Sequence, residues 1–238
     1  MGWFKHWFGT RYYSLLYGHR DEVDAQAWVD TILGQWSLPV GSHVLDLACG
    51  RGRHANCFAA AGMNVTGVDI SEASIAEART LVPSADFRVR DMREPFARGS
   101  FDAVCCLFTS LGYFEDLEDD RRVFLVVADA LKPGGRFVVD FMNTGLVLRD
   151  LVPAEEMTVE GVDFRIARSH SNGVLVKRIC VNDDCGEHLF EERVQALTPL
   201  QLEEMALNAG FIIEDRTDGP LKRPFDPGSS QRFVLWMR

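Results

Sequence analysis

Between about residues 44 and 141, short apolar runs alternate with segments of helical pattern, and this alternation constrains the fold more than any other feature of the sequence. The apolar runs predict strands at 43–48, 64–69, 86–90, 101–108 and 136–141. The segments between them predict helices at 53–61, 71–81 and 118–131. Because the strands are almost continuously apolar, both faces of their sheet must be covered. The sequence therefore predicts an α/β fold built on a parallel sheet.

Other kinds of structure flank this region. An amphipathic helix is expected at about 21–36, and the tyrosine-rich segment RYYSLLYGHR precedes it. After Asn143 the sequence changes to runs of alternating character with turn signals at Asn172-Gly173 and at 182–186. An Asn-Gly pair between such runs is a strong hairpin signal. This part of the chain is therefore expected to form an antiparallel meander of three or four strands.

The end of the chain returns to the earlier pattern. A helix is predicted after Thr198, which is a suitable cap, and it ends near Gly210. Two closing strands are predicted at 211–216 and 232–237. We therefore expect one core formed by residues 1–143 and 197–238, with residues 144–196 as an antiparallel β insert.

Composition narrows the classes of partner. The 238 residues suffice for one α/β domain with an insertion. A formal net charge of -10 disfavours phosphate backbones and anionic membranes and favours a small-molecule or protein partner. No apolar run approaches the roughly 18 residues of a membrane span. The six cysteines do not form a zinc pattern, so no metal site is predicted and a reduced, cytoplasmic protein is expected.

The segment VLDLACGRGRHA, residues 44–55, indicates a ligand site. A helix that begins just after a strand points unpaired backbone N–H groups beyond the sheet edge, and Gly50 and Gly52 allow a ligand to approach closely. Ligands of such folds bind at the carboxyl ends of the strands. Asp46 would be explained by a ligand that carries an ammonium group, although its side chain could instead cap the following loop.

Two further acids end the next two predicted strands. Asp69 ends the second strand, where a carboxylate can accept hydrogen bonds from both hydroxyls of a ribose. Asp91 ends the third strand, where it can accept from an adenine amino group while the amide of Met92 donates to a ring nitrogen. Asp91 could instead cap the turn that follows it. With Asp46, these acids predict a site for a positively charged adenosine compound.

The segments VLDLACGRGRHA, GVDI, VRDM, FDAVCCLFTSLGYF and LKPGG, in this order and spacing, resemble the class I S-adenosylmethionine-dependent methyltransferases of small-molecule type. The resemblance covers about residues 21–141 and the closing strands. It implies a Rossmann-like seven-stranded sheet, with S-adenosylmethionine as cofactor and S-adenosylhomocysteine as product. It also implies that the insert forms a lid or an oligomer contact, which would make a homodimer.

The resemblance implies a set of cofactor-binding residues. The backbone of Ala48 to Gly50 would hold the methionine end, Asp69 and Ile70 the adenosine, and Asp91 and Met92 the adenine. The full set is Tyr13, Asp46, Ala48, Cys49, Gly50, Gly52, Asp69, Ile70, Asp91, Met92, Leu107 and Phe108. Leu107 and Phe108 would lie by the sulfonium. Tyr13 is the preferred contact from the N-terminal tyrosines, ahead of Tyr12 and Tyr17.

The cofactor sets the chemistry. Its sulfonium already makes the methyl group electrophilic, so the enzyme mainly aligns a nitrogen or oxygen nucleophile and excludes water. A base is needed only if the nucleophile arrives protonated. Tyr113, His54 and Asn143 are candidate catalytic residues, and each could equally be a packing or solvated side chain. The segment LFTSLGYF has neither an Asn-Pro-Pro-Tyr loop nor a Pro-Cys pair, so a nucleic-acid acceptor is not expected.

Two other functions remain open from the sequence. GRGRHA also fits the G-x-G-x-x-A form of a dinucleotide site, which would make the protein an NAD-dependent oxidoreductase. The protein could also be a non-catalytic regulator that binds the cofactor and recognises another protein through the meander. Removing the meander, about residues 155–195, should spare cofactor binding but change acceptor use or oligomeric state.

Overall fold

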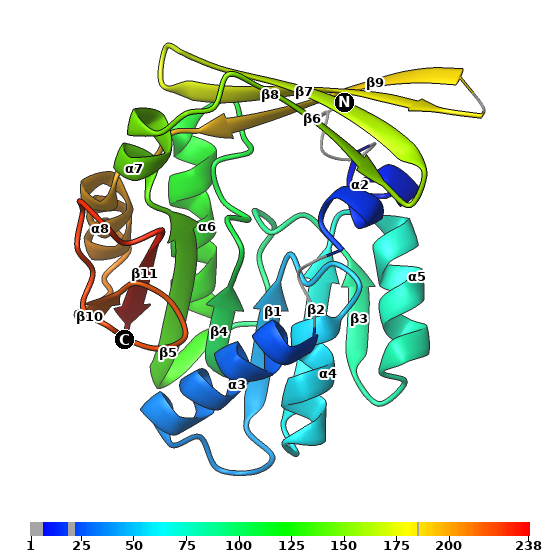
Figure 1. The fold of residues 1–238 in the computed structure, drawn as a ribbon. Coiled ribbons are helices and arrows are strands. Elements are labelled where there is room, and N and C mark those ends of the chain that lie inside the picture. Colours follow the sequence, from blue (N-terminus) through cyan, green and yellow to red (C-terminus); the bar gives the residue numbers. More distant parts are fainter. Residues whose placement is uncertain (1–6, 19–21, 185) are drawn as a thin grey trace.

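The computed structural model describes residues 7–18, 22–184 and 186–238. Its main sheet is formed by β1 (His43–Leu47), β2 (Asn64–Asp69), β3 (Asp86–Val89), β4 (Phe101–Cys106), β5 (Leu131–Met142), β10 (Ile213–Thr217) and β11 (Arg232–Met237). The strand order is β10-β11-β5-β4-β1-β2-β3 (Figure 1). β11 is antiparallel to both neighbours, and the other pairs are parallel. The predicted seven-stranded α/β fold is confirmed.

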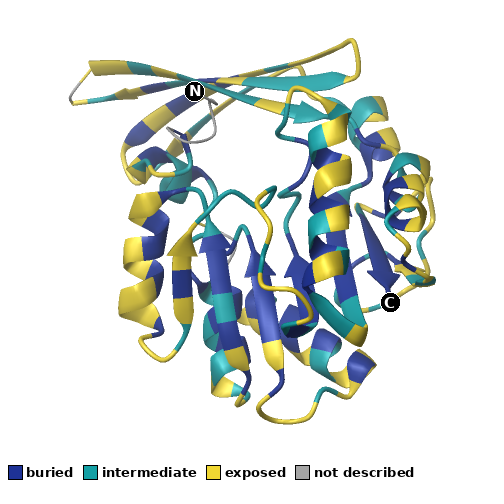
Figure 2. Cartoon of the chain, turned by 180° about the vertical axis from the view of Figure 1, so that it is seen from behind, coloured by how far each residue is buried: buried dark blue, intermediate teal, exposed yellow. Residues whose placement is uncertain are grey.

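Helices cover both faces of this sheet. One face packs against α3 (Glu22–Trp36), α4 (Arg53–Ala60) and α5 (Glu72–Leu81), and the other against α6 (Leu117–Ala130) and α8 (Pro199–Asn208). Along β1, Val44 contributes to the first core and Leu45 and Leu47 to the second, as side chains alternate in a strand. Figure 2 shows the central strands of the main sheet buried between the helices. None of the helices in the described residues is long and apolar enough to cross a membrane.

The order of the strands reverses beside β1. β1 lies between β2 and β4, and the connections from these strands lead to opposite edges of the sheet. The loops at the carboxyl ends of β1 and β4 therefore separate and leave a crevice. Folds of this kind bind ligands at such a switch point.

The insert forms a second sheet. After the short helix α7 (Thr144–Arg149), the chain forms β6 (Ala154–Val159), β7 (Val162–Ser171), β8 (Val174–Asp183) and β9 (Gly186–Gln195). These four strands are antiparallel and lie across the carboxyl ends of the main sheet (Figure 1). Asn172 and Gly173 have φ of 50° and 75°, as a tight hairpin turn requires. The predicted meander is confirmed, with four strands.

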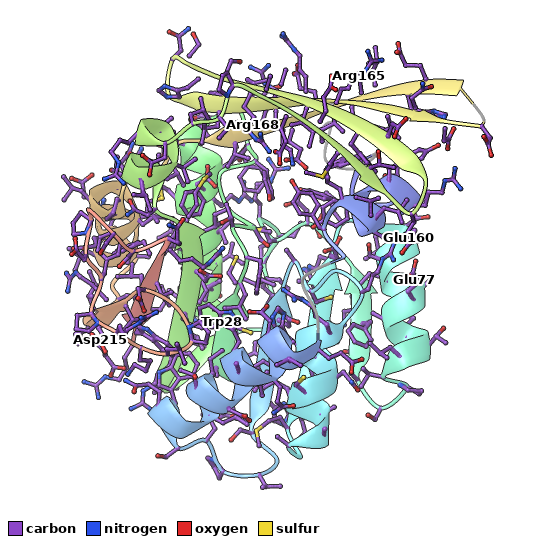
Figure 3. All side chains as sticks on the ribbon, viewed as in Figure 1. Trp28, Glu77, Glu160, Arg165, Arg168 and Asp215 are labelled. Atoms are coloured by element: carbon purple, nitrogen blue, oxygen red, sulfur yellow. The ribbon has the colours of Figure 1, made fainter. Side chains whose placement is uncertain are left out.

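The meander has an outer and an inner face. Arg165 is on the outer face and its side chain is 57% exposed, whereas Arg168 points toward the main sheet and is 24% exposed (Figure 3). The inner face packs on α2 (Arg11–Leu16), a helix capped by Thr10. The buried residues of this third apolar cluster come from 7–16 and the meander: Trp7, Tyr12, Leu16, Val162, Phe164, Ile166, Ile179 and Val181. The described N-terminal segment is thus packed on the insert.

Two of the predicted strands begin at other residues in the structure. β5 begins at Leu131, before the Lys132–Gly135 segment that was expected to precede it, because Leu131 already pairs with Phe101 ahead of a bulge. β10 begins at Ile213 because the Phe211 amide donates to Ala206 O and closes α8 (3.0 Å). The helix expected at about 21–36 is α3, and residue 21 lies outside the described residues.

Candidate functional site

A cavity of about 400 Å³ lies at the carboxyl ends of β1, β2 and β4, a size typical of small-molecule sites. Residues of 8–18 line its other side. The cavity brings together most of the predicted cofactor and catalytic residues: Tyr13, Asp46, Ala48, Cys49, Gly50, His54, Asp69, Ile70, Asp91, Met92, Leu107, Phe108 and Tyr113. It also includes residues that were not predicted, among them Phe8, Arg51, Arg53, Ser74, Arg90 and Phe114.

The loop after β1 is tightly turned. Ala48 has φ of 54° and Gly50 of 54°, and a left-handed conformation costs a non-glycine residue about 1–3 kcal/mol. The Cys49 amide donates to Val68 O (2.9 Å), which ties the loop to β2. α4 follows with no side-chain cap, so its first backbone amides remain available to a ligand at this end.

Gly52 was predicted to contact the cofactor, but it does not line the cavity. It has φ of 85°, and a Cβ there would lie 3.0 Å from Ala78 Cβ and 3.2 Å from the Phe87 ring. Gly52 is therefore required for the close packing of this loop on α5 and β3. The structure gives Gly52 a packing role, which the sequence did not separate from a ligand-facing one.

Asp69 connects the loop to the end of β2. Its Oδ2 accepts from the Gly50 amide (2.9 Å) and its Oδ1 from the Ser71 amide (2.8 Å). Burial raises the pKa of Asp69, and these backbone donors act in the opposite direction. The carboxylate thus fixes the loop while it faces the cavity.

Asp46 is buried, and part of its hydrogen-bonding capacity is unused. Its side chain is 1% exposed, and its Oδ2 has no hydrogen-bond partner among the described residues. The Cys105 thiol is near its Oδ1 (3.8 Å). Burial raises the pKa of Asp46 to about 7, and the charge of Arg53 lowers it. A buried acid of this kind favours a cationic ligand group beside it.

Arg53 was not predicted as a site residue, although the basic character of GRGRHA was a signal. Its Nη1 lies 3.2 Å from Asp24 Oδ2, and its guanidinium stacks 4.0 Å from the centre of the Phe108 ring. It is the first residue of α4 and lines the cavity near Asp46. A carboxyl group, that of Asp46, and a guanidinium cation, that of Arg53, therefore lie at the same end of the cavity.

Asp91 has the capping role that the sequence left open. Its Oδ1 accepts from the Arg93 amide and from Arg93 Nε (3.0 Å each), and its Oδ2 accepts from Arg93 Nη2 (2.6 Å). Asp91 also lines the cavity, so the carboxylate that caps this turn borders the site. Met92 follows and also lines the cavity.

The backbone after β4 is held by a buried ion pair. Phe108 has φ of 60°, and its amide donates to Asp140 Oδ2 (2.9 Å). Arg232, on β11, donates from Nη2 to the same oxygen (2.6 Å) and from Nε to Oδ1. The Phe108 ring stacks with the guanidiniums of Arg53 and Arg232, at 4.0 and 5.1 Å. This arrangement was not predicted.

Tyr113 lies in the next part of the same loop. The Gly112 amide donates to the buried Asp120 Oδ1 (2.7 Å), and Gly112 O accepts from the Gln195 amide at the end of β9 (2.6 Å). Burial raises the pKa of Asp120 to about 7. Tyr113 is therefore placed at the cavity by α6 and by the insert together.

The other two catalytic candidates differ. His54 lines the cavity and packs on Phe108 (ring centroids 5.5 Å apart). Burial, followed by the charge of Arg53, lowers its pKa to about 3, so the ring is neutral at pH 7 and a weak base. Asn143 does not line the cavity: its Nδ2 donates to Pro227 O (3.0 Å) and Ser230 O (2.8 Å). The expectation that Asn143 faces the acceptor is therefore wrong.

Aromatic side chains form the side of the cavity near the meander. We call Phe8, Tyr13, Tyr17 and Tyr113 the aromatic wall. Phe8 lies 5.0 Å from Tyr13 and 5.4 Å from Tyr113, and Tyr13 lies 4.9 Å from Tyr17, between ring centroids. Tyr12 instead donates to Asp183 Oδ2 on the meander (2.8 Å) and does not line the cavity.

Comparisons with known proteins show similarity to methyltransferases. The family described as "Methyltransferase domain" matches residues 44–135. A dTDP-3-amino-3,4,6-trideoxy-alpha-D-glucopyranose N,N-dimethyltransferase of Streptomyces venezuelae is 28% identical over 221 residues, covering 89% of this chain and 93% of that protein. The putative methyltransferase YqeM of Bacillus subtilis (strain 168) is 29% identical over 222 residues and covers 87% of each chain.

Solved structures show the same fold. An S-adenosylmethionine-dependent methyltransferase from Clostridium acetobutylicum ATCC 824 has a TM-score of 0.82 with 20% identity over 95% of each chain. The S-adenosylmethionine-bound amino pentose methyltransferase CalS10 from Micromonospora echinaspora has a TM-score of 0.73 with 22% identity over 96% of each chain.

These matches bear out the resemblance found in the sequence: residues 44–135 match a methyltransferase domain, and the chain has the fold of S-adenosylmethionine-dependent methyltransferases. The NAD-dependent oxidoreductase and the non-catalytic regulator, the two other sequence-based hypotheses, are not supported by them. Which residues hold the cofactor and the acceptor is a separate question.

Proposed function

We propose that the protein transfers the methyl group of S-adenosylmethionine to a nitrogen or oxygen atom of a small molecule bound beside the aromatic wall. Relatives of both kinds support this acceptor class: the sugar N,N-dimethyltransferase of S. venezuelae, and a ubiquinone biosynthesis O-methyltransferase of Xanthomonas axonopodis pv. citri (strain 306), which is 29% identical over 194 residues. The net charge of -10 supports a small-molecule acceptor over a nucleic acid.

The observation that carries the proposal is the buried, partly unpartnered carboxylate of Asp46 next to Arg53. The amino-acid end of the cofactor has an ammonium and a carboxylate, so it complements this pair of opposite charges. We assign the ammonium to Asp46 and the carboxylate to Arg53. The backbone of Ala48, Cys49 and Gly50 would complete this end of the site.

The remaining cofactor residues extend along the strand ends. We assign the ribose hydroxyls to Asp69 with Ile70, and the adenine to Asp91 with Met92, all of which line the cavity. Leu107 and Phe108 would border the sulfonium, which supplies the electrophilic methyl group when the cofactor is bound. The backbone here is held by Asp140, whose carboxylate accepts from the Phe108 amide.

The protein's own contribution is to orient the acceptor and exclude water. Positioning of this kind lowers a barrier by up to about 7–11 kcal/mol. The aromatic wall covers the cavity on the side away from the strands, and Tyr13 is its preferred contact to the cofactor. Tyr113 is our candidate for a hydrogen bond to the acceptor. His54 is neutral and therefore suited to accept a hydrogen bond rather than to hold a proton.

We also propose the division into a core of 1–143 and 197–238 and an insert of 144–196. A homodimer through the insert would have to use an outer face whose charges are paired within the sheet, such as Arg165 with Glu187 (3.2 Å) and Arg178 with Glu191 (3.0 Å). Light scattering coupled to size-exclusion chromatography tests this contact.

The five described cysteines are free, which supports a cytoplasmic protein.

Calorimetry with S-adenosylhomocysteine and with NADH tests the proposed site. We expect S-adenosylhomocysteine to bind with one site per chain and NADH to give no binding heat. Asp46→Asn should weaken the first interaction, because the amide cannot pair with the ammonium. Binding of NADH alone, or unchanged binding by the variant, would contradict the assignment.

The pKa of Asp46 predicts a pH dependence. The free protein has an Asp46 pKa of about 7, and the ligand ammonium requires the ionised form, so the acid must lose its proton on binding at lower pH. We expect the Kd for S-adenosylhomocysteine to be about tenfold weaker at pH 6 than at pH 8. Asp46→Asn should bind weakly at both pH values, and a pH dependence that survives in this variant would assign the effect to another group.

A further inference from the structure

Three rings of the aromatic wall, those of Phe8, Tyr13 and Tyr17, are attached to the meander rather than to the main sheet. Within the described residues, the apolar cluster that contains Tyr13 and Tyr17 is completed by meander residues such as Phe164 and Phe190. Toward the core, the ring of Phe8 lies 5.4 Å from Tyr113. One side of the proposed cofactor site is therefore built on the insert.

One carboxylate joins the two parts. Glu192, in the middle of β9, is on the inner face, and its side chain is 12% exposed. Its Oε1 accepts from Trp7 Nε1 (2.6 Å), and the Tyr17 hydroxyl lies 2.8 Å from Oε1 and 3.0 Å from Oε2. Two side chains of the N-terminal segment thus converge on a single acid of the insert.

A lysine completes this cluster. Lys177 is directly opposite Glu192 in the β8–β9 register. Its Nζ donates to the Tyr17 hydroxyl (2.7 Å) and lies 3.9 Å from Glu192 Oε2. The Tyr17 hydroxyl is therefore fixed between an ammonium and a carboxylate in a mostly buried place, where charge-assisted hydrogen bonds are strong.

We infer that Glu192 is a positioning residue for cofactor binding: from the meander, it holds Tyr17 and Trp7 so that the aromatic wall stays over the cavity. The inference rests on the proposed cofactor site. Tyr17 itself lines the cavity, while Glu192 acts through it. The insert would thus support the site from the lid position that the resemblance implied. On this inference, removal of 155–195 should weaken cofactor binding, contrary to the expectation from the sequence, because it would take away the support of the wall.

The test is Glu192→Gln, with binding of S-adenosylhomocysteine measured by calorimetry. Glutamine has the same size as glutamate but carries no charge. Its NH₂ group would replace an oxygen that now accepts from Trp7 or Tyr17. We expect the Kd to weaken about tenfold. Glu191→Gln is the matched control, because Glu191 is next in sequence but pairs with Arg178 and Arg193 on the outer face (3.0 and 3.1 Å). The control should bind as the wild type does.

Hydrogen exchange separates positioning from a general loss of structure. With S-adenosylhomocysteine bound, we expect amides of 7–17 to exchange about tenfold faster in Glu192→Gln than in the wild type, with those of 43–47 unchanged. Unchanged Kd and exchange would overturn the inference, as would faster exchange throughout the core. If the wild type itself does not bind S-adenosylhomocysteine, the proposed site fails instead.

A second variant covers the case in which Glu192→Gln does not fold. Tyr17→Phe removes the hydrogen bond from the other side and keeps the ring. We expect a similar loss of affinity. In the double variant, the loss should be no larger than that of the stronger single variant, since both changes break the Tyr17–Glu192 contact. Additive losses would mean that Glu192 does not act through Tyr17.

Discussion

Replacement of Asp69 by alanine is expected to weaken the binding of S-adenosylhomocysteine by about 1–3 kcal/mol, or roughly 5- to 150-fold, which calorimetry would measure. The physical reason is twofold. Asp69 is our acceptor for the ribose hydroxyls, and it also accepts the amides of Gly50 and Ser71 (2.9 and 2.8 Å), so its removal loosens the loop that would hold the methionine end.

Asp86→Ala is the matched control for this prediction. Asp86 begins the neighbouring strand β3, but it is half exposed, pairs with Arg88 and does not line the cavity. Its replacement should leave the Kd unchanged. An Asp69→Ala variant that binds as tightly as the control would remove Asp69 from the site.

Arg232→Met should cost about 3–5 kcal/mol in the free energy of unfolding at neutral pH. The change leaves Asp140, whose side chain is 0% exposed, as a buried carboxylate without its cationic partner. It also removes one of the two guanidiniums that stack on Phe108, so binding of S-adenosylhomocysteine should weaken as well. Urea unfolding followed by circular dichroism measures the first effect.

The pH dependence of this loss has a definite sign. Burial raises the pKa of Asp140 while Arg232 lowers it, so loss of the arginine raises the pKa further. A raised folded-state pKa destabilises the protein increasingly as the pH rises above the unfolded value of about 3.9, because the unfolded chain then ionises more readily. The deficit should therefore be smaller at pH 5.5 than at pH 7.5.

Arg216→Met provides the comparison for the ion pair. Arg216 pairs with Glu203 (2.6 Å), but its side chain is 45% exposed, and exposed pairs contribute at most about 1 kcal/mol. Its loss should be small and nearly independent of pH over this range. Equal losses in the two arginine variants would show that the Asp140 pair is not specially important.

The parts of the fold that local chemistry determines were predictable. Helix starts follow their caps: the Ser71 hydroxyl accepts from the Ser74 amide, and Thr198 and Gln201 form a capping box. Strands buried on both faces give continuous apolar runs, so the main sheet could be recognised. The acids at the strand ends could be placed together because carboxyl ends of parallel strands share one edge of a sheet.

The parts that depend on distant pairing were not predictable. Asp140 and Arg232 are 92 residues apart and meet only because β5 pairs with β11, and Trp7 and Glu192 are 185 residues apart. No local pattern encodes such contacts. Asn143 was misread for a related reason: it caps α7, and a six-residue helix is too short to show a helical period in the sequence.

The cavity has a floor made by the strand ends of the main sheet and a roof made by residues of 8–18, which pack on the meander. The floor carries the acids that we assign to the cofactor, and the roof carries rings of the aromatic wall, beside which we place the acceptor. Grafting residues 7–18 and 144–196 together from a related enzyme should then transplant acceptor preference while cofactor affinity is retained. Grafting either segment alone should impair both acceptor preference and cofactor affinity, since the two segments pack against each other.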